Sequence, residues 1–233
     1  MLTVDFDMLA VRGGDIVLDA GCGFGRHSLE FMKRGARVFS MDMDMDSLLK
    51  TRFILSELKK QLGDNNSGYI VHSGDALNLP FNDDTFDRII CAEVMEHVGD
   101  DNKACEELSR VLKKNGRMAI TVPTFFSEMI YDCLTFEYFA TPGGHVRKYL
   151  PKKLVSIMKN NGLIIYGIGF KHAFHTLWWM IRCVVGLHYN DHPITRGYHH
   201  FLHLGLYSNF IRRIERFCNF FFPKSIVIYA WKP

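Results

Sequence analysis

The chain has 233 residues and a mass of 26.9 kDa, a size that suits one domain or one domain with a subdomain. Its hydrophobic fraction of 48% and charged fraction of 23% are near globular averages, which argues against disorder, collagen-like repeats and a coiled coil. A net charge of +3 is too small to indicate nucleic-acid binding, and the six cysteines form no Cys-x-x-Cys pair of the kind found in zinc ribbons.

Short apolar segments alternate with helical patterns through the first half of the chain, which is typical of a doubly wound α/β domain. Strands are predicted at residues 15–19, 37–41, 69–71, 86–91 and 117–122. Helices are predicted at 25–33, from Asp46 to Leu62, and at 103–112, and Asp46 or Ser47 is expected to cap the second of them.

The pattern changes after Thr124, where a stretch rich in aromatic residues, glycine and histidine begins. A helix at 152–159, a sixth strand at 163–168 and a last strand at 225–231 are predicted beyond it. The insertion at 171–222, with helical segments around 176–186 and 198–221, is too long for a simple loop and predicts a cover. We therefore expect a core at 1–170, a helical, aromatic-rich cover at 171–222 and a strand at 223–233 that returns to the core sheet.

The run Leu18-Asp-Ala-Gly-Cys-Gly-Phe-Gly25 lies between the first predicted strand and the helix that follows it. Glycines allow a tight turn and a close approach of the backbone to a ligand, and the helix N-terminus attracts an anionic group. A dinucleotide-binding loop would have a third glycine where this chain has Arg26, so a nicotinamide cofactor is disfavoured. Asp42 ends the second strand, where its carboxylate can hold ribose hydroxyls.

Four motifs occur in an order that resembles class I S-adenosylmethionine-dependent methyltransferases, in particular the type 11 group with the enzymes of ubiquinone and menaquinone biosynthesis. They are the Asp19–Gly25 loop with Asp42, and the runs Gly74–Phe81, Phe86–His97 and Leu108–Gly116. The resemblance implies a Rossmann-like sheet of seven strands in the order 3-2-1-4-5-7-6, with the last strand antiparallel. It also implies S-adenosylmethionine as the cofactor and S-adenosylhomocysteine as its product.

Carried over position by position, the resemblance implies a set of cofactor contacts at the ends of the strands. They are Asp19, Gly21, Cys22, Gly23, Asp42, Met43, Asp75, Ala76, Cys91 and Glu93. The glycine loop would wrap the methionine part, Asp42 the ribose, and Met43, Asp75 and Ala76 the adenine. Cys91 and Glu93 would line the floor near the sulfonium, and Asp19 would orient the loop or meet the amino group. A metal-binding cluster of Asp42, Asp44 and Asp46 is the alternative for the acids after the second strand.

The acceptor side rests on the run Gly143-Gly144-His145-Val-Arg147-Lys148-Tyr149. Imidazole suits proton transfer near neutral pH, so His145 is a candidate base, and His97 is a second candidate catalytic residue. Arg147 is expected to be an anion clamp or a structural anchor.

The late histidines are the second part of the acceptor side, and His172, His175 and Trp178 are candidate substrate contacts. The pairs His172-x-x-His175 and His188-x-x-x-His192 also have spacings that a metal could use. Caps, turns and core hydrogen bonds are the expected roles, and no metal is predicted.

Charge divides unevenly along the chain. From Lys171 onward there are eight Lys and Arg residues and two acids, a net of +6, which leaves −3 for the first part. Arg212, Arg213 and Arg216 beside several phenylalanines would suit a helix that contacts an anionic membrane surface or lipid headgroup. The alternative is ordinary packing with solvated arginines.

These features predict a methyltransferase that acts on a small hydrophobic acceptor such as a lipid, a quinone or a prenylated ring, and not on nucleic acid. The alternatives are a soluble small-molecule or sugar acceptor, and a non-catalytic protein that binds S-adenosylmethionine or a membrane surface. The N-terminus shows no basic segment followed by an apolar core, and the apolar run at 173–187 is shorter than the roughly 20 residues of a membrane span. A cytoplasmic protein, with peripheral membrane contact, is expected.

Overall fold

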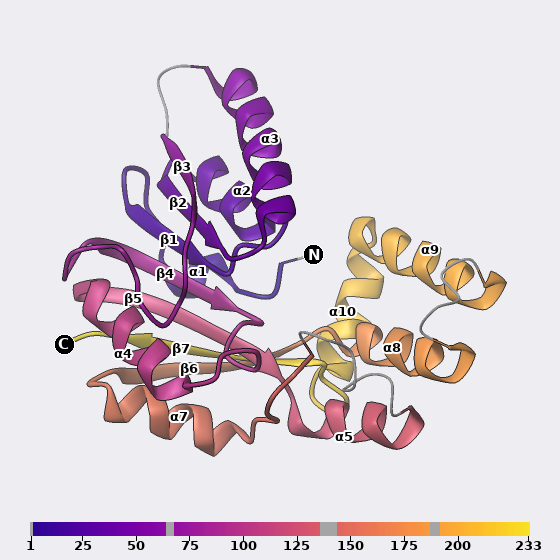
Figure 1. Cartoon of the computed structure of the whole chain (residues 1–233). Helices are drawn as coiled ribbons and strands as arrows, with labels where there is room; N and C mark the ends of the chain where they lie inside the picture. Colours follow the sequence, from indigo (N-terminus) through magenta and orange to yellow (C-terminus); the bar gives the residue numbers. More distant parts are fainter. Residues whose placement is uncertain (1, 64–67, 136–143, 187–191) are drawn as a thin grey trace.

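A computed structural model describes residues 2–63, 68–135, 144–186 and 192–233 (Figure 1). Its centre is one seven-stranded sheet in the order β3-β2-β1-β4-β5-β7-β6. The strands are β1 (Ile16–Ala20), β2 (Arg37–Asp42), β3 (Tyr69–Ser73), β4 (Phe86–Ala92), β5 (Leu112–Pro123), β6 (Ile164–Lys171) and β7 (Ser225–Trp231). β7 runs antiparallel to β5 and β6, whereas β3, β2, β1, β4 and β5 are parallel. The predicted fold class and strand order are confirmed.

Helices cover both faces of the sheet. α1 (Phe6–Leu9), α2 (Arg26–Lys33) and α3 (Met45–Leu62) pack on one face, and α4 (Asp101–Val111) and α7 (Pro151–Asn160) pack on the other. Successive strand residues point to opposite faces, so Val17 joins the cluster with Phe31 while Leu18 joins the one with Leu108. This double coverage explains why the central strands are almost continuously apolar.

The N-terminus of α3 differs from the prediction. Asp44, not Asp46, is the capping residue, and its carboxylate accepts a hydrogen bond from the Ser47 N–H at 3.1 Å. Asp46 already lies in the first helical turn, where a negative charge is favourable but cannot cap the helix.

Four helices gather at one end of the sheet (Figure 1): α5 (Phe125–Leu134), α8 (Ala173–Val185), α9 (Pro193–Tyr207) and α10 (Asn209–Cys218). α8 packs against α5, α9 and α10. In sequence, α8, α9 and α10 lie between β6 and β7, whereas α5 precedes β6. Asn219 joins this group to the start of α8, because its side-chain oxygen accepts a hydrogen bond from the Ala173 N–H at 2.8 Å. The domain boundaries at 170 and 222 stay a prediction. Within the described ranges, no helix has both the length and the apolarity needed to cross a membrane.

Candidate active site

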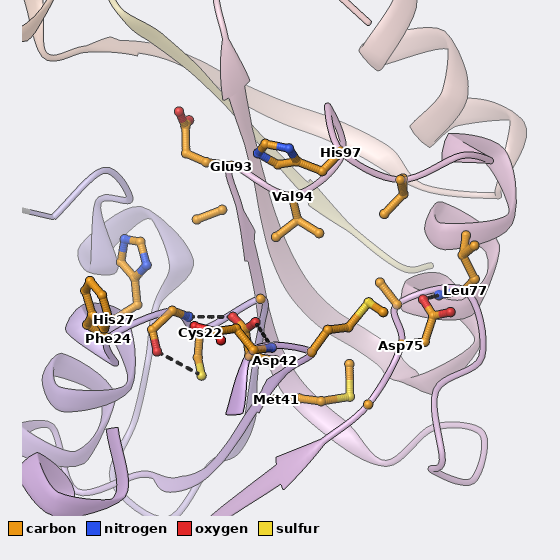
Figure 2. A pocket seen from close by; sticks show the side chains of 18 of the residues that line it. Cys22, Phe24, His27, Met41, Asp42, Asp75, Leu77, Glu93, Val94 and His97 are labelled. Carbon is orange, nitrogen blue, oxygen red and sulfur yellow. Dashed lines mark hydrogen bonds between the residues drawn. The ribbon is translucent and has the colours of Figure 1, made fainter. Parts of the chain in front are cut away.

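A cavity of about 820 Å³ opens at the carboxyl ends of β1 to β4, a volume in the usual range of small-ligand pockets (Figure 2). Eight of the predicted cofactor contacts line it, together with His97: Gly21, Cys22, Gly23, Asp42, Met43, Asp75, Ala76 and Glu93. In a parallel sheet these loops meet at one edge, which is the usual place for a ligand. Figure 2 shows Glu93, Val94 and His97 on one side of the cavity and Cys22 and Asp42 on the other.

The loop after β1 takes a backbone path that requires glycine. Gly21 and Gly23 have φ angles of 72° and 51°, in the left-handed region. A Cβ on Gly21 would lie 2.1 Å from Cγ2 of Val94, whereas one on Gly23 would meet nothing within 4 Å. The Gly23 N–H donates to the Asp42 carboxylate at 2.8 Å, so the loop after β1 is fixed to the end of β2.

Acidic side chains dominate the charged groups of the lining. The carboxylates are Asp42, Asp44, Asp75 and Glu93, and Arg26 is the guanidinium among the lining residues. Hydrogen bonds inside the loops explain the first two acids: Asp42 also accepts from the Asp44 N–H at 2.9 Å, and Asp44 caps α3. A cavity of this charge favours a ligand that carries positive charge. The cavity therefore fits S-adenosylmethionine, whose sulfonium is cationic. Three features support this fit: the volume of the cavity, its acidic lining, and a glycine loop in which a Cβ on Gly21 would clash with Val94.

Two of the predicted cofactor contacts do not line the cavity. Asp19 is fully buried under the loop, where it accepts a hydrogen bond from the Ser28 hydroxyl at 2.6 Å. It therefore holds the start of α2 against β1, which agrees with the expectation that it orients the loop. Burial raises the pKa of Asp19 to about 6.

Cys91 is the second, and its predicted place on the cavity floor is wrong. Its side chain lies in the apolar core between the sheet and α4, because the alternation along β4 turns it toward that face. Burial raises the pKa of its thiol above the ordinary value, so Cys91 is a packing residue.

The two candidate catalytic histidines come together from distant parts of the chain. The ring centroids of His97 and His145 are 4.8 Å apart, and Nδ1 of His97 lies 3.4 Å from the Gly144 carbonyl oxygen. Nδ1 of His145 makes a short hydrogen bond to the fully buried carboxylate of Glu128, on α5. His97 lines the cavity, whereas His145 is not among the lining residues. Sequence reasoning missed Glu128, since nothing in its local pattern separates it from an ordinary helix residue.

Glu93 follows β4 in a left-handed conformation, with a φ of 58°, which is unusual for a residue with a side chain. Its carboxylate accepts hydrogen bonds from the Lys224 ammonium and the Thr121 hydroxyl, both at 2.9 Å. Burial alone would raise the pKa of Glu93, but the Lys224 charge and these hydrogen bonds hold it below its ordinary value. Burial, and then the Glu93 charge, raise the pKa of the neighbouring Glu96 well above its ordinary value. The pKa values of these two neighbouring carboxyl groups are therefore shifted in opposite directions.

Arg147 makes the contacts of a structural anchor, and a role as an anion clamp stays a prediction. Its guanidinium pairs with the Asp101 carboxylate at 2.6 Å and donates to the Gly99 carbonyl at 2.5 Å. Tyr149 donates to the same carboxylate at 2.8 Å. These contacts fix the segment that carries His145 to the start of α4. Gly143, from the same predicted run, lies outside the described residues.

His172, His175 and Trp178 lie at and after the start of α8, outside the cavity lining. Nε2 of His172 is 3.2 Å from the Thr3 hydroxyl oxygen, and the Thr3 N–H donates to His27 at 3.3 Å. His27 does line the cavity, so Thr3 stands between the α8 histidines and the cavity wall. Substrate contacts by these three residues stay a prediction.

Two sets of side chains in the described ranges bring three metal-ligating atoms within 4.8 Å of one another. One set is Glu96, His97 and His145, and the other is His172, His175 and Glu215. In the first set the raised pKa of Glu96 favours its protonated form, and Glu128 already occupies one nitrogen of His145.

Comparison with known proteins assigns the fold to a class. Residues 18–120 match the methyltransferase domain family. The chain is 37% identical over 107 residues to demethylmenaquinone methyltransferase of Thermobifida fusca, covering 46% of this chain and 43% of that protein. It is 31% identical over 147 residues to the ubiquinone/menaquinone biosynthesis C-methyltransferase UbiE of Paracoccus denitrificans, covering 60% and 57%.

Solved structures agree on the fold. An S-adenosylmethionine-dependent methyltransferase from Mesorhizobium loti superposes with a TM-score of 0.59 at 16% identity, covering 97% of this chain and 95% of that one. The cyclase SpnF superposes with a TM-score of 0.63, also at 16% identity, over 97% and 77%. These likenesses concern the fold alone, since the same architecture supports more than one reaction.

The fold and the glycine loop therefore define a class I, S-adenosylmethionine-dependent architecture, and the predicted resemblance and cofactor class are confirmed. Within that class, residues 18–120, less than half of the chain, match the methyltransferase domain family. The matched segments span about half the length of the curated relatives.

Proposed function

We propose that this protein transfers a methyl group from S-adenosylmethionine to a small apolar acceptor. The observation that carries the proposal is the cavity itself, which has the glycine loop and Asp42 on one side and Glu93 and His97 on the other. The cofactor supplies an electrophilic methyl carbon on a cationic sulfur when it is bound. The chain's own residues then bind and orient the reactants and remove a proton.

The binding roles follow from the lining. The backbone of Gly21 to Gly23 lies against the cavity, where it can enclose the amino-acid part of the cofactor. Asp42 stands at the end of β2 with the direction of its carboxylate fixed by two backbone N–H groups, and it would accept from the ribose hydroxyls. Asp75, whose own loop is held by its bond to the Leu77 N–H at 2.9 Å, would accept from the adenine amino group. Met43, 71% exposed at the cavity, would lie over the adenine ring.

The catalytic role belongs to the His145–Glu128 pair. Glu128 fixes the imidazole of His145 and would stabilise the imidazolium that forms when an acceptor that reaches past His97 gives His145 a proton from an oxygen or an acidic carbon. His97 packs edge-on against His145 and borders the cavity, so it would contact the acceptor directly. Carbon and oxygen acceptors both need such a base, and the two relatives described above are named for quinone methyltransferases. A soluble or sugar acceptor is the alternative.

Transfer of a labelled methyl group from S-adenosylmethionine to a lipid extract tests the activity. We expect label in the organic phase, a rate about 100-fold or more lower for His145→Ala, and an unchanged rate for His200→Ala, an exposed histidine on α9. Label found only in polar metabolites would contradict the apolar acceptor. Binding of the cofactor without transfer to any fraction would favour a non-catalytic protein.

We also propose that α10 places the protein on an anionic membrane surface, where an apolar acceptor would be found. Phe210, Ile214 and Phe217 recur every three or four residues and so share one face of α10, with exposed fractions of 72%, 40% and 70%. Phe221, 56% exposed, lies in the turn after the helix. The adjacent Phe220 is 83% exposed. An exposed apolar face of this kind is costly in water unless something covers it.

The charges around this face match an anionic partner. Arg212, Arg213 and Arg216 are exposed on the same helix, and its acid, Glu215, is buried on the opposite side. Aromatic side chains flanked by arginines suit the boundary between lipid headgroups and acyl chains, and each basic residue near the surface adds about 1 kcal/mol of attraction.

Co-sedimentation with vesicles tests the surface. We expect binding to vesicles that contain phosphatidylglycerol, weaker binding to phosphatidylcholine alone, and loss of binding for the double variant Phe210→Ser/Phe217→Ser. The matched control is Ile70→Ser, which removes a 51% exposed apolar side chain from β3, at the opposite edge of the sheet. Equal sedimentation of the double variant and the control would show that α10 does not bind the membrane surface.

A further inference from the structure

Three metal-ligating side chains meet where the cover joins the sheet, on elements far apart in sequence. His172 precedes α8 with a φ of 69°, His175 follows within the first turn, and Glu215 comes from α10. One ligating atom from each lies within 4.8 Å of the others. The fold brings this cluster together, because the His172-x-x-His175 spacing alone supplies only two of the three side chains.

The cluster is buried and incompletely satisfied. His172 and Glu215 are each 8% exposed. Nδ1 of His175 and Oε1 of Glu215 are both shielded from solvent, and neither has a hydrogen-bond partner among the described residues. Buried polar atoms in proteins nearly always have a partner, so two such atoms in one cluster point to a bound group.

Both imidazoles lie in surroundings that disfavour their charged forms. Burial lowers the pKa of His172 well below its ordinary value and that of His175 to about 4. Burial raises the pKa of Glu215, although the Lys171 charge and a hydrogen bond from the Phe174 backbone act in the opposite direction. Of the cations near the cluster, Lys224 already pairs with Glu93 at 2.9 Å.

We propose that His172, His175 and Glu215 bind one divalent transition-metal ion of the zinc type, with the fourth position open to water. Two imidazoles and one carboxylate are a known ligand set for zinc. Ligand atoms about 2.0–2.1 Å from a tetrahedral ion lie about 3.3 Å from each other, so atoms that are now up to 4.8 Å apart need to approach by up to about 1.5 Å.

A neighbouring hydroxyl group can hold one of the proposed ligands in place. Metal-bound histidines usually give their other ring nitrogen to an oxygen acceptor, and Nε2 of His172 lies 3.2 Å from the Thr3 hydroxyl. The ion would join the start of α8 to α10 and, through Thr3, to the segment that contacts His27 at the cavity wall. It would therefore brace the cover against the core, independently of what is methylated.

Metal titration of the full chain, after removal of bound metal with a chelator, tests the site. We expect one equivalent of Co²⁺ with a visible absorption band, displacement by Zn²⁺, and a higher melting temperature with Zn²⁺. His175→Ala and the nearly isosteric Glu215→Gln should each weaken binding about tenfold or more. His200→Ala is the matched control and should bind as the wild type does.

Two results would overturn the proposal. One is a wild-type protein that binds neither ion at micromolar concentration while it still binds S-adenosylhomocysteine, which shows that it is folded. The other is metal binding that persists in both His175→Ala and Glu215→Gln but is lost in His97→Ala, which would place the ion at the cluster of Glu96, His97 and His145. Because metal content and cofactor binding are read separately, failure here leaves the proposed methyl transfer standing.

Discussion

Asp19 shows how a single residue under the cofactor loop makes stability depend on pH. Its pKa of about 6 in the folded protein is above the ordinary value of 3.8, because the carboxyl group is fully buried. The folded state therefore holds this proton more tightly than the unfolded state does. Its contribution to stability is complete below pH 3.8 and is lost as the pH rises through 6.

Asp19→Asn should remove this dependence while it keeps an oxygen that accepts from Ser28. Two pKa units correspond to about 3 kcal/mol, so the unfolding free energy of the wild type relative to the variant should fall by that order between pH 4 and pH 7. Urea unfolding at several pH values measures it, with the exposed Asp46→Asn as control. Parallel pH profiles for wild type and Asp19→Asn would show that Asp19 is not the buried acid described.

At the scale of the elements, the segment with His145 is held by a network at the start of α4. Arg147→Ala removes the ion pair to Asp101, whose carboxylate keeps its bonds to Tyr149 at 2.8 Å and to Lys153 at 3.4 Å. We expect a loss of about 1–2 kcal/mol in unfolding free energy, because Asp101 loses its guanidinium partner but keeps Tyr149 and Lys153.

An anchor and a substrate clamp differ in their kinetics. As an anchor, Arg147 should change kcat more than KM, because the substitution displaces His145 and leaves the cofactor side of the cavity, at the ends of β1 to β3, in place. The exposed Lys152→Ala on α7 should change neither value. A large rise in KM with stability unchanged would instead make Arg147 a substrate contact.

Local patterns predict the elements well where one signal dominates. The last strand lies at 225–231 as predicted, because a run of apolar residues between Pro223 and the chain end has a single interpretation. The predicted helix at 198–221 is in fact two helices, since the hydroxyl of Ser208 caps α10 by accepting from the Ile211 N–H at 3.4 Å. Apolar spacing cannot reveal such a break, because the side-chain pattern continues through it.

In the candidate site, too, only the residues with a local sequence signal could be predicted. The glycine loop and the acids at strand ends are local motifs, so Gly21, Asp42 and Asp75 could be placed from the sequence. Glu128 and Lys224 could not, because they pair with His145 and Glu93 across 17 and 131 residues of chain. Cys91 was misplaced because a strand end in sequence does not say which face its side chain takes.

At the scale of the whole molecule, the two halves of the sheet support different parts of the structure. Its parallel half ends in the loops that form the cavity, and its antiparallel half, β7 with β6, is where the cover is inserted (Figure 1). Lys224, just before β7, reaches back to Glu93 at the cavity, so the segment that leads into the last strand is tied to the cofactor side by this ion pair.

The most direct test of this account is calorimetric titration of the purified chain with S-adenosylhomocysteine. We predict one site of micromolar affinity, and affinity about tenfold or more lower for Gly21→Ala, whose Cβ would lie 2.1 Å from Val94 in a left-handed backbone. Gly14→Ala carries similar backbone strain, with a φ of 86°, but nothing lies within 4 Å and it is outside the cavity, so its affinity should match the wild type. No heat of binding from the folded wild-type protein would contradict the account.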